Sequence, residues 1–96
     1  MLMSSKVSVP PDVLVNQIDG ESVILNLATE SYFGLDEVGT RMWSVLITSE
    51  SVHQAYDTLI AEYRVEADTL HRDLTDLVEK LVEKGLLEVS ELQAKL

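Results

Sequence analysis

The sequence contains no cysteine among its 96 residues. This absence excludes a disulfide scaffold, a zinc ribbon and a thiol nucleophile. There is also no run of 18 apolar residues, so no transmembrane helix is predicted. Residues 1–9 contain one lysine and no apolar core segment, which argues against a signal peptide. We therefore expect a cytoplasmic protein that does not bind membranes.

Basic residues are scarce. The chain has 7 Lys and Arg against 17 Asp and Glu, a formal net charge of −10 at pH 7. Nucleic acid binding relies on Lys and Arg to replace the counterions of the phosphate backbone, so this balance argues against a nucleic acid partner. It argues equally against anionic membrane surfaces. The content of 46% apolar and 25% charged residues is that of an ordinary globular domain, and the length suits one small domain.

The first half of the sequence has the pattern of short antiparallel strands. Residues 13–18 are rich in β-branched side chains, and Asp19-Gly20 predicts a two-residue hairpin turn, because both positions of a type I′ turn need positive φ. In residues 22–27 Val, Leu and Leu alternate with Ser, Ile and Asn, and residues 28–30 form a second turn. The predicted strands are Val13–Ile18, Ser22–Leu27 and Ser31–Leu35. Together they make a three-stranded meander.

After Leu35 the apolar spacing changes to three and four residues, which is typical of helices. Asp36 is the predicted cap of a helix that runs to about residue 47, and Ser49 is the predicted cap of a second. A third, longer helix is expected to end at Gly85. We expect an α+β domain over 12–89, with one sheet edge exposed beside a long helix. Residues 1–11 are predicted to be a flexible arm that adds an edge segment through Val7 and Val9, and residues 90–96 a C-terminal tail.

No group of residues has the spacing of a catalytic or metal site. His53 and His71 lie on predicted helices without partners at metal-ligand spacing, so both are interpreted as solvated. The glycine-rich phosphate loops and the nucleophile elbow are absent. We therefore expect no catalytic residue, no metal and no cofactor. Gly39 lies in a first helical turn, which indicates close packing against a neighbour, and Phe33 and Trp43 are interpreted as core anchors.

One segment resembles a known family. Tyr32-Phe33-Gly34-Leu35-Asp36, followed by Gly39, Trp43 and Leu46, resembles the signature of the PqqD-like family, and most closely the subgroup of lasso-peptide biosynthesis. The similarity covers about residues 12–89 and continues through Tyr63, Val65, Leu70, Asp73, Leu81 and Gly85-Leu86-Leu87. Members that serve quinone-cofactor synthesis carry Asp-Gly after the first helix. This chain has Ile47-Thr48-Ser49 there, which favours the peptide-maturation branch.

The resemblance implies a recognition element for ribosomally made, modified peptides, with a winged-helix-like fold of three strands and then three helices. Such proteins are not enzymes. They bind the leader segment of a precursor and deliver it to a leader peptidase, with a separate ATP-dependent cyclase in lasso pathways. An exposed strand edge can capture an unstructured peptide by strand addition.

On this reading the peptide-binding residues fall in two groups. The strand that pairs with the peptide comprises Ser31, Tyr32, Phe33, Gly34 and Leu35. The pockets between this strand and the third helix are expected to be lined by Leu70, Asp73, Leu74, Leu77 and Val78. Asp73 is expected to pair with a cation of the leader, and Leu81 to belong to the core.

Three alternatives remain open at this point. The first is a PqqD-type peptide chaperone for a radical-SAM enzyme. The second is a winged-helix DNA-binding protein, although residues 66–84 hold six acidic side chains against Arg72, Lys80 and Lys84. The third is a structural subunit that activates an enzyme without contacting peptide.

Overall fold

A three-stranded antiparallel sheet forms the first half of the protein. The computed structural model describes residues 3–90. Its sheet has the order β2-β3-β4, with bounds Val13–Ile18, Glu21–Asn26 and Tyr32–Leu35. Asp19 and Gly20 join β2 to β3 with φ angles of 54° and 84°, as the predicted hairpin turn requires. The predicted meander is therefore confirmed.

The two faces of β3 differ in an unexpected way. Ser22, Ile24 and Asn26 face the core and are buried, whereas Val23 lies on the other face and is 44% exposed. The two polar side chains tolerate burial because each has a partner. Ser22 Oγ lies 2.8 Å from Thr40 Oγ1, and the amide of Asn26 binds the turn after β3 and the end of the last helix.

Three helices follow the sheet, with the bounds Glu37–Thr48 for α1, Val52–Glu62 for α2 and Ala67–Glu83 for α3. Asp36 caps α1 as predicted, since its carboxylate accepts a hydrogen bond of 2.8 Å from the backbone N–H of Gly39. The prediction for α2 was wrong by two residues: Ser51 is the cap, while the Ser49 hydroxyl donates back to the carbonyl of Val45. Gly85 follows α3 with a φ of 75°, as expected for a helix stop.

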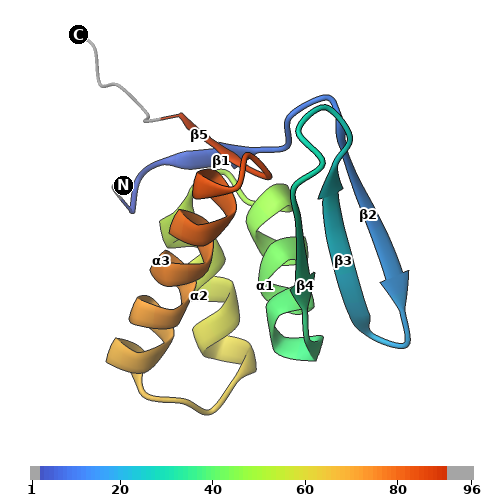
Figure 1. The fold of residues 1–96 in the computed structure, drawn as a ribbon. Coiled ribbons are helices and arrows are strands. Elements are labelled where there is room, and N and C mark those ends of the chain that lie inside the picture. Colours follow the sequence, from blue (N-terminus) through green and yellow to red (C-terminus); the bar gives the residue numbers. More distant parts are fainter. Residues whose placement is uncertain (1–2, 91–96) are drawn as a thin grey trace, which may run out of the picture.

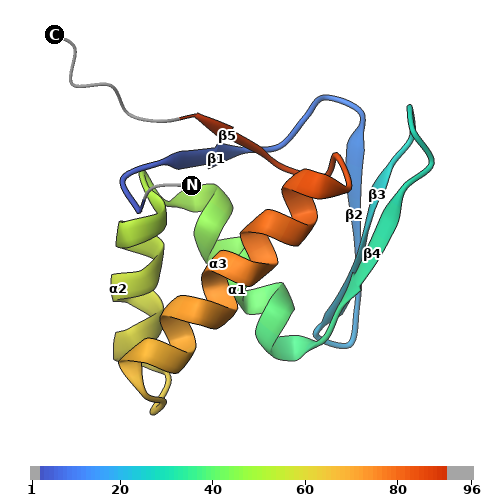
Figure 2. The same cartoon turned by 60° about the vertical axis from the view of Figure 1, so that its left-hand side comes forward.

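The helices pack on one side of the sheet around an apolar core (Figure 1). Trp43 of α1 is almost completely buried, and α3 contributes a stripe of buried residues at helical spacing, namely Leu70, Leu74, Val78 and Leu81. Figure 2 shows α3 crossing α1, with β4 next to the helices and the β2–β3 hairpin projecting away from them. The expected α+β order of three strands and three helices is confirmed, and "winged-helix-like" describes it only loosely.

A second, two-stranded sheet joins the two ends of the described chain. β1 (Lys6–Ser8) pairs antiparallel with β5 (Glu88–Ser90), and Val7, opposite Val89, is buried. The segment that was expected to be an arm thus contains a strand, and this strand pairs with β5 and not with the edge of the larger sheet. Of the predicted tail, residue 90 lies in β5, and residues 91–96 lie outside the described part of the chain.

Candidate functional site

One edge of the larger sheet is open along β4. The backbone N–H of Asn26 donates a 2.9 Å hydrogen bond to the carbonyl of Ser31, which makes this a hydrogen-bonded pair. Bonded and non-bonded pairs alternate in an antiparallel ladder, so the register places Tyr32 and Gly34 at non-bonded positions. Their backbone groups therefore point away from β3. Within residues 3–90 no other strand pairs with β4 on that side.

A groove runs between this edge and α3, with a volume of about 500 Å³. β4, the first two turns of α1 and one side of α3 form its walls. The lining residues are Phe33, Gly34, Leu35, Asp36, Val38, Gly39, Met42, Asp73, Asp76, Leu77 and Lys80. The open edge and the groove therefore lie side by side, so a strand added to β4 would have the groove beneath it.

The floor of the groove is apolar and closely packed. Leu35 and Met42 are buried, and Phe33 and Leu77 pack partly exposed against the core. Gly39 allows α1 to begin close to β4, because a Cβ at this position would lie 3.1 Å from Cδ2 of Leu35. The close approach expected at Gly39 is thus confirmed, and its neighbour is the last residue of the preceding strand.

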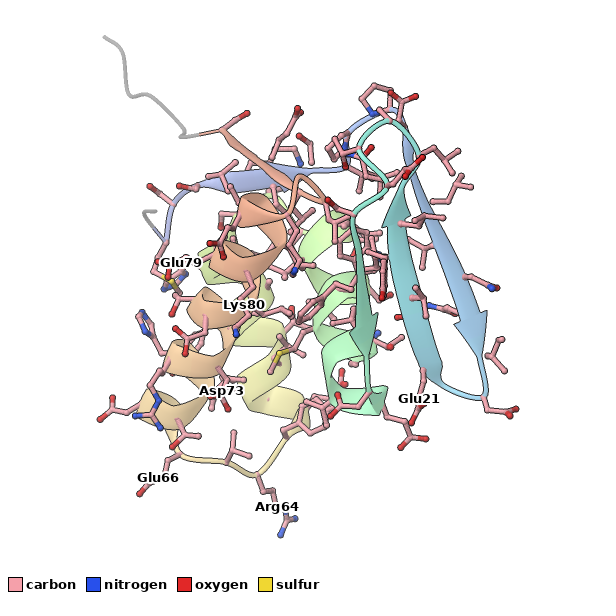
Figure 3. The ribbon with its side chains drawn as sticks, in the orientation of Figure 1. Glu21, Arg64, Glu66, Asp73, Glu79 and Lys80 are labelled. Atoms are coloured by element: carbon pink, nitrogen blue, oxygen red, sulfur yellow. The ribbon has the colours of Figure 1, made fainter. Side chains whose placement is uncertain are left out.

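Charged side chains stand on the α3 wall. Asp73, Asp76 and Lys80 are exposed, and none of them forms an ion pair with any residue in the described range 3–90. Figure 3 shows Asp73 and Lys80 on the side of α3 that faces β4, and Glu79 on the other side. Further along, the Lys84 ammonium lies 6.0 Å from the centroid of the Phe33 ring. The groove therefore offers unpaired charges of both signs.

A bidentate ion pair lies outside the groove and joins α1 to α2. The guanidinium of Arg41 donates hydrogen bonds of 2.8 and 2.7 Å to the two carboxylate oxygens of Glu62. These hydrogen bonds, and the charge of Arg41, lower the pKa of Glu62 below its ordinary value. The same contact raises the pKa of Arg41.

Only some of the residues that were predicted to bind peptide line the groove. Phe33, Gly34, Leu35, Asp73 and Leu77 do line the groove. Ser31 directly precedes β4 and Tyr32 is the first residue of this strand, and neither lines the groove. The Tyr32 side chain is 67% exposed on the outer face of the sheet. The expected lining by Leu70, Leu74 and Val78 needs correction, because all three point into the core.

The prediction missed several lining residues. Val38, Gly39 and Met42 come from α1, whereas the sequence prediction drew the groove walls from β4 and the third helix alone. Asp76 and Lys80 carried a usable signal, since they lie three and seven residues after Asp73 and share its side of α3.

A second hollow, of about 560 Å³, lies at the hairpin end of the sheet. It is lined by strand and turn residues together with Asp36, and it shares Gly34 and Leu35 with the groove. No helix contributes a wall beyond that cap residue. The groove is therefore the better candidate site, because it combines an open strand edge with a helical wall.

The remaining candidates for chemistry are surface groups. His53 Nδ1 lies 3.3 Å from the Asp57 carboxylate one turn away, and His71 packs edge-on against Tyr56 with the ring centroids 6.1 Å apart. Among the residues that the structure describes, no three His, Asp or Glu side chains gather as metal ligands would. No helix in this part of the chain is long and apolar enough to cross a membrane.

Known proteins match both the sequence and the fold. The structure of TbiB1 in complex with the TbiA(beta) leader peptide has 42% sequence identity and a TM-score of 0.77, covering 84% of this chain and 94% of that chain. A lasso peptide synthetase B1 complexed with the leader peptide has 26% identity and a TM-score of 0.76, covering 86% and 98%. No curated protein matches significantly. The family model for coenzyme PQQ synthesis protein D (PqqD) matches residues 21–87, and the chain therefore belongs to the PqqD family.

Proposed function

We propose that this protein is a non-catalytic peptide-binding protein of lasso-peptide maturation. It captures the leader segment of a ribosomally made precursor and delivers it to a leader peptidase, in a pathway that also uses an ATP-dependent cyclase. The observation that carries the proposal is the open edge of β4 above the groove. Similarity to two structures that hold leader peptides supports it.

The mechanism follows from the backbone of β4. An unstructured leader that lies alongside this strand gains main-chain hydrogen bonds with Tyr32 and Gly34, whose backbone groups face the open edge. These bonds do not depend on the leader's side chains, so they provide affinity but little selectivity. Every second side chain of the added strand points into the groove, and there Phe33, Leu77 and Met42 offer an apolar surface.

Two alternative functions would require different features of the protein. A chaperone for a radical-SAM enzyme in quinone-cofactor synthesis would suit the description of the family model. Residues Ile47-Thr48-Ser49 and the leader-bound neighbours favour the lasso pathway. A DNA-binding role would need a basic recognition helix, whereas α3 carries Asp73, Asp76 and Glu79 among its exposed residues.

A proline at the open edge tests strand addition. Gly34→Pro removes an N–H that faces the incoming peptide, and its ring occupies the space beside β4. We expect calorimetric titration with the leader of the precursor encoded nearest to the protein's gene to show a loss of at least about tenfold in affinity. Co-incubation with the peptidase encoded there should show slower cleavage of the precursor.

Gln17→Pro is the matched control. Gln17 lies on β2, and the register places its N–H at the other open edge of the same sheet, away from the groove. The variant should fold and bind the leader as the wild type does. If Gly34→Pro retains the wild-type circular dichroism spectrum and binds the leader equally well, strand addition at β4 is wrong.

A further inference from the structure

Charged side chains follow one another in a fixed order along the α3 wall of the groove. Asp73 and Lys80 lie seven residues apart on the side of α3 that faces β4, which places them about 10 Å apart along the helix axis (Figure 3). Leu77 lies between them. Asp76 also lines the groove, directly before Leu77 and one turn before Lys80. Along α3 the wall thus carries the carboxylates of Asp73 and Asp76 before Leu77 and the ammonium of Lys80 after it.

Charged residues at the ends of α3 and β4 continue the same order of charges along the groove. Lys84, one turn after Lys80, lies over the ring of Phe33 near the start of β4. Asp36, directly after the end of β4, also lines the groove, where its carboxylate caps α1. The Leu35 end of the strand therefore faces carboxylates, and the Tyr32 end faces ammonium groups. Because these lysines and Asp73 form no ion pair within residues 3–90, their charges are available to a ligand.

A peptide that adds to β4 as a strand would place its side chains beside these charges at regular intervals. Alternate side chains of an extended peptide lie about 7 Å apart on one face, so three successive inward side chains span about 13 Å. That length matches the distance from Asp73 to Lys80 once flexible side chains are allowed for. Three inward positions would therefore meet the acidic end, the apolar centre of Leu77 and Phe33, and the basic end in turn.

We propose that the groove selects its peptide by charge order. The preferred segment has the pattern basic–x–apolar–x–acidic from its N- to its C-terminus, and it pairs antiparallel to β4, as β3 already does. The basic side chain then lies near Asp73 and Asp36, and the acidic one near Lys80 and Lys84. This inference rests on the proposed function and adds a selectivity that backbone pairing lacks.

Two synthetic peptides of identical composition test the proposal. Both are twelve residues long and neutral outside the centre, which reads Lys-Thr-Leu-Thr-Glu in one and Glu-Thr-Leu-Thr-Lys in the other. Titrations of the full chain, followed by amide chemical shifts, should show about tenfold tighter binding of the first peptide at low salt. Added salt should narrow the difference, because exposed charges are screened.

Exchanging the two groove charges should reverse this preference. The double variant Asp73→Lys with Lys80→Glu keeps the net charge and should bind the second peptide more tightly. The matched control is Arg72→Glu with Glu79→Arg, which exchanges charges on the same helix at the same spacing, at two residues that do not line the groove. It should keep the wild-type preference.

Four outcomes would overturn the proposal that the groove selects its peptide by charge order. These are equal binding of both peptides, a wild-type preference for the second peptide, an unchanged preference in the Asp73 and Lys80 exchange, or no shift with either peptide at millimolar concentration. Failure of the proposed function is recognised separately. If Gly34→Pro still weakens binding of the natural leader while charge order has no effect, leader capture stands and only the charge selection is wrong.

Discussion

The side-chain amide of Asn26 donates a 2.8 Å hydrogen bond to the carbonyl of Gly85 and so ties the sheet to the end of α3. Its oxygen accepts hydrogen bonds of 2.9 and 3.1 Å from the backbone N–H groups of Ala28 and Thr29. One buried side chain therefore fixes the turn that leads into β4 and anchors the helix across from it. Because β4 and α3 form two of the walls of the groove, this residue links both of them to the core of the protein.

We expect replacement of Asn26 to destabilise the fold. Asn26→Ala leaves the Gly85 carbonyl and two N–H groups without their partner, which should lower the free energy of unfolding by about 1–3 kcal/mol. Asn26→Asp keeps both acceptor contacts but cannot donate to Gly85 when ionised. Urea unfolding measures both variants. If Asn26→Asp is as stable as the wild type at neutral pH, the bond to Gly85 contributes nothing.

The ion pair of Arg41 and Glu62 should make stability depend on pH. The pKa of Glu62 is lowered in the folded state, so its contribution is present above the ordinary carboxyl pKa of about 4.3 and is lost as the pH falls through the lowered folded value. Thermal unfolding of Glu62→Gln and the wild type should differ at neutral pH and converge in acid. Salt should also reduce the difference.

Glu66→Gln is the control for this measurement. Glu66 is an exposed carboxylate that makes no side-chain hydrogen bond as the cap of α3, and it forms no ion pair within residues 3–90. Its replacement should leave stability unchanged across the same pH range. If Glu62→Gln follows the wild type at every pH, the ion pair does not contribute to folding.

Two glycine variants compare a crowded position in a helix with an open position in a strand. Alanine in a helix is normally favoured over glycine by about 0.5–1 kcal/mol. At Gly39 the new Cβ would lie 3.1 Å from Leu35, which is buried and has little room to move. We expect Gly39→Ala to be less stable than the wild type by about 1 kcal/mol, since overpacking outweighs the gain. Gly34→Ala should fold normally, because its Cβ meets nothing within 4 Å. If Gly39→Ala is more stable than the wild type, the Leu35 side chain can move aside at little cost in free energy.

Two leucines of α3 should separate binding from stability. Leu74 is 0% exposed in the core, so Leu74→Ala should lower the free energy of unfolding by about 2–5 kcal/mol. Leu77 is only partly buried and lines the groove, so Leu77→Ala should lower stability less and weaken leader binding more. Urea unfolding and leader titration of both variants test this. Equal leader affinity of Leu77→Ala and the wild type would remove Leu77 from the site.

Features that depend on local conformation could be predicted from the sequence. The Asp19-Gly20 turn needs positive φ at both positions, and Asp36 and Gly85 have side-chain or backbone properties that suit the ends of helices. The cap of α2 was harder to predict from the sequence, because Ser49 and Ser51 are both serines near the start of the helix. The distinction arises only because the Ser49 hydroxyl is engaged by the end of α1.

Features that depend on distant partners could not be predicted. Nothing local shows that Ser22 and Asn26 face the core, because their partners, Thr40 and Gly85, lie far along the chain. The same holds for the site. Leu74 and Leu77 are the same residue type on one helix, and only the positions of β4 and α1 decide which of them lines the groove.

The pairing of β1 with β5 has a consequence for how a newly made molecule folds. During synthesis β1 leaves the ribosome first, and it has no partner until β5 has emerged. The hairpins of the larger sheet and the three helices rest on contacts closer in sequence, and such contacts form early. β4, α1 and α3 can thus assemble while β1 is still unpaired. The pairing of β1 with β5 is therefore among the last contacts that the described part of the chain can form.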